Sequence, residues 1–161
     1  MRENFQTALA AASRSTAIPE SHDVYGWLVG DWDLEALVYK AVEVPHPMGR
    51  IHFAWVLEGR AIQDTWILSD RMYGTTLRIW NPTLQAWDIR WFNPLSSHYE
   101  SQTGRRIGGE IVQIGARPDG TPTRWRFTEI TSASFHWIGE SLKHDGKSWL
   151  LEGEFIAKRK P

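Results

Sequence analysis

Two charged side chains fall within aromatic and aliphatic runs of this sequence, and they are the first candidates for chemistry. Asp64 lies between Ile62 and Trp66. Arg78 lies two residues before Trp80. Because alternate residues of a strand share a face, an apolar face would carry each charge away from water. A desolvated carboxylate could act as a general acid or base, and a guanidinium could anchor an acidic ligand. The alternative is an Asp64–Arg78 ion pair that only fixes the core.

Three further residues could transfer protons, namely His136, Tyr99 and Glu129. His136 shares one face of its strand with Glu140, and the two would form an acid–base pair if that face were inward. The aromatic residues on either side of His136 favour an outward placement. Tyr99 and its neighbour His98 point to opposite faces, so one of them should enter the interior. Glu129 follows two aromatic residues of an inward face, near a strand end.

Aromatic residues are unusually frequent, with ten Trp, six Phe and four Tyr in 161 residues. Since a buried indole usually needs a partner for its N–H, this number implies either an aromatic core or a cavity walled with rings. The residues expected to contact a ligand, besides Arg78, are Trp55, Trp66, Trp80, Trp91, Trp125, Phe127 and Trp137.

Several kinds of chemistry lack support in the sequence. Cysteine is absent, which removes disulfides, thiolate nucleophiles and thiolate metal ligands. Metalloprotease, hydrolase, phosphate-loop and dinucleotide motifs are also absent, so no metal or cofactor is expected. A formal net charge of -1 without a basic run speaks against nucleic acid as a partner. Apolar stretches are too short for a signal peptide or a membrane span, so we expect a cytoplasmic protein.

The elements that position these residues are predicted to be strands. Residues 1–24 should form a helix from Glu3 to Ser13 and an extended segment, followed by a barrel domain over 25–161. Alternating runs punctuated by Gly, Pro, Asn and Asp indicate about ten antiparallel strands joined by hairpins. They are Trp32 to Lys40, Arg50 to Leu57, Ala61 to Ser69, Tyr73 to Trp80, Gln85 to Phe92, Ser97 to Thr103, Gly108 to Ile114, Arg124 to Ile130, Ser134 to Ser141 and Trp149 to Ala157.

Such a chain hides its edges best as an all-β, up-and-down antiparallel barrel that closes on itself. Alternation assigns most inward faces and includes Val38 and Glu129 among the inward residues. For two strands, alternation does not decide which face points inward. In the fourth, either Thr76, Arg78 and Trp80 or their neighbours face inward, and in the ninth the same choice concerns His136.

The opening of the first strand, Gly30-Asp31-Trp32, resembles the Gly-x-Trp signature of the calycins, the lipocalins and their fatty-acid-binding relatives. There the Trp closes the barrel floor against a basic residue near the last strand, which implies a contact between Trp32 and Arg159. A wider set of motifs is similar to uncharacterised bacterial lipocalin-like domains over residues 25–160. The motifs are Trp27-Leu28-Val29-Gly30-Asp31-Trp32, Trp55-Val56-Leu57-Glu58-Gly59-Arg60, Arg124-Trp125-Arg126-Phe127, Phe135-His136-Trp137 and Asp145-Gly146-Lys147-Ser148-Trp149.

The resemblance implies a ten-stranded barrel with an internal cavity, and it brings no established activity. The haem-binding nitrobindin-like relatives take their iron ligand from a His near the C-terminal strand. This chain has no His after His144, so haem is not expected.

The preferred interpretation is a monomer or homodimer that binds a small apolar or aromatic molecule in a Trp-lined cavity, and acidic and polycyclic molecules belong to the expected class. Asp64 and Arg78 would orient that molecule. A second hypothesis is a cofactor-independent cyclase, isomerase or hydratase of secondary metabolism that uses a desolvated carboxylate and a His or Tyr. A third is a barrel packed solid, without a cavity, that serves in interactions.

Overall fold

The fold, seen in a computed structural model that describes residues 2–161, is an all-β barrel with one short helix. Ten long strands form it, and an eleventh of two residues, β2, is paired to β1. The strands are β1 (Gly30–Tyr39), β2 (Val42–Glu43), β3 (Met48–Val56), β4 (Ala61–Leu68), β5 (Met72–Asn81), β6 (Ala86–Asn93), β7 (His98–Ile107), β8 (Glu110–Ala116), β9 (Pro122–Thr128), β10 (Ser134–Leu142) and β11 (Trp149–Arg159). The ten predicted runs correspond to the ten long strands, while β2 was not predicted.

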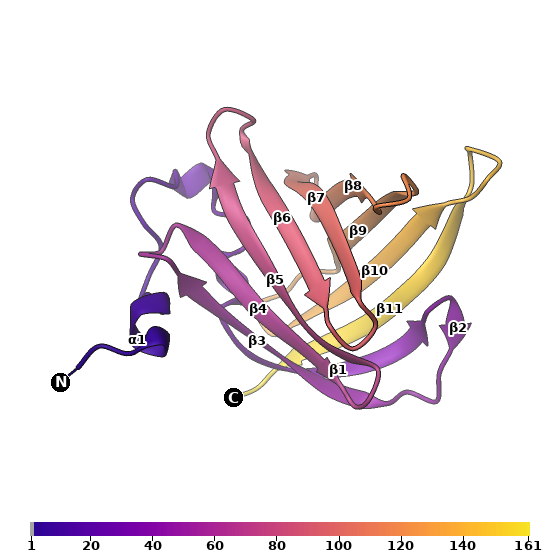
Figure 1. Cartoon of the computed structure of the whole chain (residues 1–161), viewed down its shortest axis with the longest axis horizontal. Helices are drawn as coiled ribbons and strands as arrows, with labels where there is room; N and C mark the ends of the chain where they lie inside the picture. The colour runs from indigo at the N-terminus through magenta and orange to yellow at the C-terminus, as the bar shows by residue number, and fades with distance from the viewer. Residues whose placement is uncertain (1) are drawn as a thin grey trace.

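The sheet closes on itself. Each long strand pairs antiparallel with its neighbours along the chain, and β11 pairs with β1 to complete the ring (Figure 1). Closure leaves the long strands without a free edge, which is the usual solution for a sequence of consecutive hairpins. The all-β, up-and-down barrel predicted from the alternating runs is therefore confirmed.

Tight turns join the strands, and one of them requires glycine. Gly59, between β3 and β4, has a φ of +75°, and a Cβ there would lie 2.1 Å from the carbonyl oxygen of Ser13. The backbone N–H of Ser15 donates to the Gly59 carbonyl at 2.9 Å. The turn thus holds the N-terminal segment against the barrel.

The N-terminal segment runs across one end of the barrel (Figure 1). Its helix α1 spans Phe5–Leu9, with Asn4 accepting a hydrogen bond from the backbone N–H of Thr7. The predicted helix, Glu3 to Ser13, was too long because Ala10 forms a β-bridge with Val56 that ends the helical hydrogen bonding. Two short 3-10 helices, η1 (Glu20–His22) and η2 (Gly26–Leu28), then lead into β1.

The end covered by this segment, here called the closed end, is packed with aromatic rings. Trp32 is fully buried, and its ring centroid lies 4.9 Å from that of Phe135. The guanidinium carbon of Arg159 lies 4.2 Å from the Trp32 ring centroid, and Arg159 pairs with Trp32 across β11 and β1. The contact implied by the calycin resemblance is present.

Two local irregularities change the predicted faces. A register shift between Ala36 and Val38 in β1 turns Tyr39, not Val38, into the barrel interior. Glu129 follows the last residue of β9 with a φ of +48°, so its side chain leaves the inward face on which alternation had placed it. The two strands left open are resolved. Arg78 and its alternate neighbours face inward on β5, and His136 faces outward on β10.

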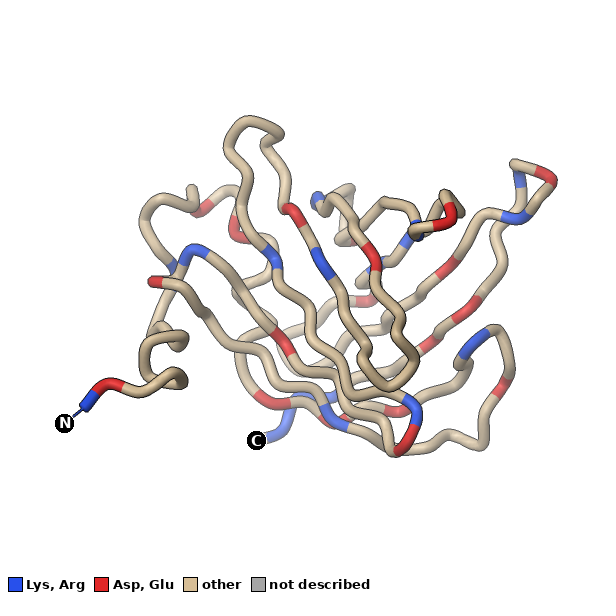
Figure 2. The backbone as a smooth tube through the Cα atoms, in the orientation of Figure 1, with Lys and Arg blue, Asp and Glu red and all other residues tan. Residues whose placement is uncertain are grey.

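Acidic and basic residues are interspersed over the strands and hairpin tips (Figure 2). Within residues 2–161, no helix is long and apolar enough to cross a membrane.

Candidate ligand-binding cavity

A cavity of about 290 Å³ opens at the end of the barrel opposite Trp32. Its lining residues come from β1, β4, β5, β6, β7, β9, β10 and β11 and from the segments that follow β1, β6 and β8. The closed end is solid, whereas this end, the open end, is hollow. The hypothesis of a barrel packed throughout is therefore wrong.

One part of the cavity wall is aromatic. The rings come from five strands and from the bulged end of β1, and they are Trp66, Trp91, Trp125, Trp137, Phe155 and Tyr39. Trp137 is central, because its ring centroid lies 5.3 Å from those of Trp125 and Phe155 and 5.7 Å from that of Trp66. These edge-to-face and tilted contacts hold the indoles in fixed orientations around the open space.

The indole N–H groups of the four cavity tryptophans are unpaired. Within residues 2–161, only Trp27, Trp32 and Trp87 donate an indole hydrogen bond, and all three lie at the closed end. The only fully buried side-chain polar atom without a partner in that range is Nε of Arg126, on the outer face. The unpaired indole N–H groups therefore border open space, where they can donate to a ligand.

The inner end of the cavity is formed by Arg78, which is held by Asp64. Both residues are 1% exposed, and Nη1 of Arg78 lies 2.5 Å from Oδ2 of Asp64. The backbone N–H of Thr76 donates to the other carboxylate oxygen at 2.7 Å. Asp64 lies behind Arg78 and does not line the cavity, whereas Arg78 and Thr76 do. Of the two hypotheses for this pair, the geometry matches the structural ion pair.

Aromatic rings surround the Arg78 guanidinium. Its central carbon lies 5.1 Å from the ring centroid of Tyr25 and 5.8 Å from those of Phe53 and Phe127. The Tyr25 hydroxyl donates to Oε1 of Gln113 at 2.9 Å. Complete burial raises the pKa of Tyr25 well above its ordinary value, so the phenol stays protonated and remains a donor. Tyr25 thus connects the N-terminal segment to the inner end of the cavity.

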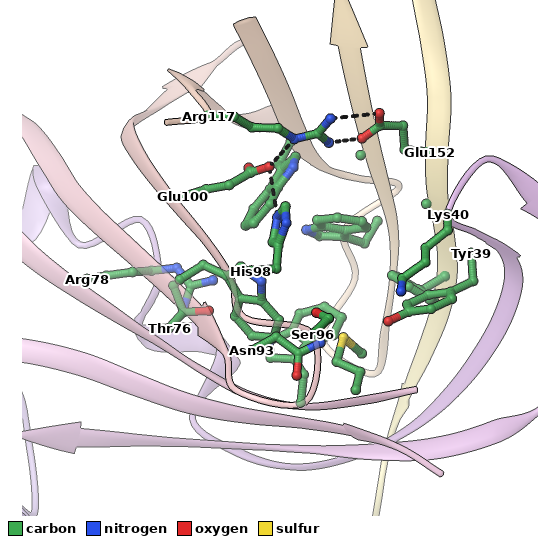
Figure 3. Close-up of a pocket in the computed structure, with 18 residues that line it drawn as sticks. Tyr39, Lys40, Thr76, Arg78, Asn93, Ser96, His98, Glu100, Arg117 and Glu152 are labelled. Carbon is green, nitrogen blue, oxygen red and sulfur yellow. Dashed lines mark hydrogen bonds and ion pairs between the residues drawn. The ribbon is translucent and has the colours of Figure 1, made fainter. Parts of the chain in front are cut away.

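Another part of the wall is a row of ion pairs built around Arg117 (Figure 3). Nε of Arg117 donates to Oε1 of Glu100 at 3.0 Å, and Nη1 donates to Oε1 of Glu152 at 3.0 Å. A second bond joins Nη2 to Oε2 of Glu152. Nε2 of His98 lies 3.1 Å from Oε1 of Glu100, and the Ser141 hydroxyl donates to Glu152 at 2.7 Å.

Two glutamines connect this row to the Asp64–Arg78 pair. Gln113 accepts from Nε of Arg78 at 3.4 Å and donates to Gln102 at 3.1 Å. Gln102 in turn donates to Glu100 at 3.3 Å. A continuous polar network therefore runs along the wall from Asp64 to Glu152, and its side chains fix one another in position.

Arg117 and Glu152 stabilise each other's charged forms. Hydrogen bonds to Glu152 hold the pKa of Arg117 above its ordinary value. Burial would raise the pKa of Glu152, but hydrogen bonds from Arg117 and Ser141 outweigh it, and the pKa lies below its ordinary value. Ligand binding near neutral pH therefore meets a charged Arg117–Glu152 pair.

Sequence reasoning missed this polar row for local reasons. Glu152 is the extra residue of a bulge, because Gly139 pairs with Gly153 while Glu140 pairs with Leu151. The bulge turns Glu152 toward the cavity. Arg117 lies just beyond β8 and belongs to none of the predicted strands. One signal was available in the sequence. The spacing of two residues between Glu100 and Gln102 predicts that both side chains lie on one face of β7, and both are buried there.

Five of the predicted ligand contacts line the cavity, and they are Arg78, Trp66, Trp91, Trp125 and Trp137. Trp55, Trp80 and Phe127 are buried outside it, toward the closed end. For Trp80 and Phe127 this is seen in their contacts, since Trp80 packs on Trp87 and Phe127 packs on Tyr25.

The other predicted proton carriers lie away from the cavity. Tyr99 is 51% exposed on the outer face of β7, and its neighbour His98 is the one that lines the cavity. The Glu129 side chain is 80% exposed. His136 lies on the outer face of β10, with Nε2 2.9 Å from Glu154 and Nδ1 3.5 Å from Glu129. His136 lies outside because it alternates along β10 with aromatic residues that face inward.

Residues 2–161 contain no group of three or more His, Cys, Asp or Glu side chains arranged to hold a metal ion. Comparison of the chain with protein-family models and with curated proteins finds no match. The closed antiparallel barrel and the Trp32–Arg159 contact are consistent with a calycin-like fold.

Proposed function

We propose that this barrel binds a small planar aromatic molecule of one or two rings, with its polar edge against the row around Arg117. The observation that carries the proposal is a hollow barrel end with indole rings on one part of its wall and hydrogen-bonding groups on the other. The cavity volume of about 290 Å³ is close to the lower limit of the usual range of small-molecule sites, roughly 300–1,000 Å³, and this supports a ligand of one or two rings.

The aromatic wall suits a flat apolar ring, because indoles stack on planar ligands and their free N–H groups can donate to an acceptor at the ring edge. The row around Arg117, together with Arg78, is here called the polar wall. It supplies acceptors in Glu100 and Glu152 and donors in Arg78 and Arg117. The two guanidiniums are already neutralised by carboxylates, and so they do not require an anionic ligand. We therefore favour an uncharged ligand that carries hydroxyl, carbonyl or ring-nitrogen groups.

The test compares the binding of a planar aromatic ligand with that of its non-planar, saturated counterpart. Calorimetric titration with naphthol and with its saturated counterpart decahydronaphthol should show saturable binding of naphthol and much weaker binding of decahydronaphthol. Trp125→Leu removes a ring of the cavity wall and should weaken naphthol binding at least about tenfold, equivalent to about 1.4 kcal/mol. The matched control is Trp149→Leu, since Trp149 stacks on Arg124 and does not line the cavity.

Binding of naphthol should be unchanged in the control variant. The proposal is wrong if the aromatic and saturated alcohols bind equally, or if Trp149→Leu weakens binding as much as Trp125→Leu.

A further inference from the structure

The polar wall contains an imidazole whose orientation is set by a buried carboxylate. The Glu100 side chain is 1% exposed, and its Oε1 lies 3.1 Å from Nε2 of His98, whose side chain is 37% exposed (Figure 3). A carboxylate accepts only, so a neutral imidazole in this contact carries its proton on Nε2. Nδ1 then holds the free lone pair. No hydrogen bond or ion pair within residues 2–161 involves Nδ1 of His98.

We propose that His98 accepts a proton from the bound ligand at Nδ1 and that Glu100 positions its ring, which makes the cavity a proton-transfer site. The inference rests on the proposed function, because it requires an aromatic ligand in the cavity. The ligand class is a phenol, or a conjugated ketone with an acidic C–H group. The O–H or C–H bond breaks, its electron pair stays on the ligand as phenolate or enolate, and the proton forms a bond to Nδ1. Nothing is oxidised or reduced.

The network around His98 supplies a carboxylate partner for the imidazolium that the transfer forms. The network contains three carboxylates, Asp64, Glu100 and Glu152, and two guanidiniums, Arg78 and Arg117. The positive charge that the transfer places on His98 lies beside Glu100, the partner already bonded to Nε2.

Cations that can stabilise the ligand anion line the same cavity as His98. Arg117, beyond β8, and Arg78, on β5, border the same space. Lys40, at the end of β1, lines the mouth, and it is the lining cation that forms no ion pair within residues 2–161. A phenolate formed in the cavity is therefore near positive charge, while the imidazolium has Glu100.

His136 offers a natural control, because it is also paired with carboxylates but lies outside the barrel. Both of its ring nitrogens are occupied, with Nε2 near Glu154 and Nδ1 near Glu129. A His→Gln substitution at this position removes an imidazole of similar setting without touching the cavity.

The experiment uses para-nitrophenol as the probe, because its phenolate absorbs visible light and its neutral form does not. The full chain is mixed with the probe at a pH where most of the free probe is neutral. Calorimetry gives the bound fraction, so absorbance is expressed per bound probe. We expect the phenolate-to-phenol ratio to be at least about tenfold higher in the complex than in buffer. His98→Gln should lose this increase, and His136→Gln should keep it.

Nitrogen NMR of the imidazole supplies an independent readout, and it should show the proton on Nε2 of His98 in the free protein. The inference is overturned if bound para-nitrophenol shows no excess of phenolate, or if the excess persists in His98→Gln. Para-nitroanisole, which has no proton to give, separates this failure from failure of the proposed function. If the ether binds and no transfer occurs, only the inference fails. If neither compound nor naphthol binds, the proposed function fails and the inference falls with it.

Discussion

The two ends of the barrel use the same residue types for different purposes. At the closed end, the indole N–H groups of Trp27, Trp32 and Trp87 donate to backbone carbonyls, at 2.8–2.9 Å. The other two tryptophans there, Trp55 and Trp80, have no indole partner within residues 2–161. Arg159 also donates to backbone carbonyls there, among them that of Val29. At the open end, the tryptophans leave their N–H groups unpaired, and Arg117 bonds to side chains instead.

The difference shows how an aromatic barrel can separate stability from binding. Polar atoms that find backbone partners avoid the cost of an unmade hydrogen bond, which favours the dense packing of buried rings at the closed end. Polar atoms that face open space leave donors for a ligand, and they require a rigid frame to keep them in place. The ion pairs and glutamines along the polar wall supply that frame.

The largest effect is expected from Trp32→Ala at the closed end. The substitution leaves a void among rings and removes the surface on which Arg159 stacks, so we expect a loss of about 3–5 kcal/mol in the free energy of unfolding. Urea unfolding measures it. Phe92→Ala, an exposed position on β6, is the control and should change stability little.

Trp125→Ala at the open end completes this comparison. Its ring already borders space on the cavity side, so the loss in unfolding free energy should be smaller, about 1–2 kcal/mol. Equal losses at Trp32 and Trp125 would contradict the distinction between a packed end and a hollow one.

The next effect concerns the ion pair at the inner end of the cavity. Asp64→Asn leaves the buried charge of Arg78 uncompensated, and we expect a loss of about 3 kcal/mol in the free energy of unfolding. The double variant Asp64→Asn with Arg78→Gln should recover part of that loss, because the unpaired charge is gone. A double-mutant cycle from denaturant unfolding gives the result, and additive losses would show that the pair is not coupled.

The smallest effect lies in the β10–β11 hairpin, beyond the open end. Hydrogen bonds from the Ser148 side chain, and from the backbone N–H groups of Ser148 and Lys147, lower the pKa of Asp145 to about 2 from 3.8. The folded pKa is below the unfolded one, so this stabilisation is complete above the unfolded pKa and is lost as pH falls through about 2. Ser148→Ala should raise the pKa of Asp145 toward its ordinary value.

An NMR titration of the Asp145 carboxyl carbon measures that shift. Ser148→Thr keeps the hydroxyl and should keep the low pKa. If Ser148→Ala leaves the pKa of Asp145 unchanged, the backbone donors alone account for it.

Much of the frame was predictable because its signals are local. Alternating apolar residues and turn residues predicted the ten long strands, and the opening Gly30-Asp31-Trp32 indicated the Trp32–Arg159 contact. Alternation also placed Trp66 and Trp125 inside the barrel, and both line the cavity. It did not show which inward rings border open space. Whether an inward ring borders the cavity depends on its position along the barrel axis, which alternation does not give. For this reason Trp55 and Phe127 were predicted, wrongly, to line the cavity with the other rings.

By itself, therefore, the sequence determined the strands, their turns and most of the inward faces, because a period of two residues and a turn motif are properties of neighbouring positions. Only the tertiary structure determined which side chains come together in the polar wall. The bulge at Glu152 shifts the side-chain phase by one residue, and Arg117 lies between two carboxylates that are distant in the chain. Closure of β11 onto β1 joins such segments, and no local pattern specifies which side chains then meet.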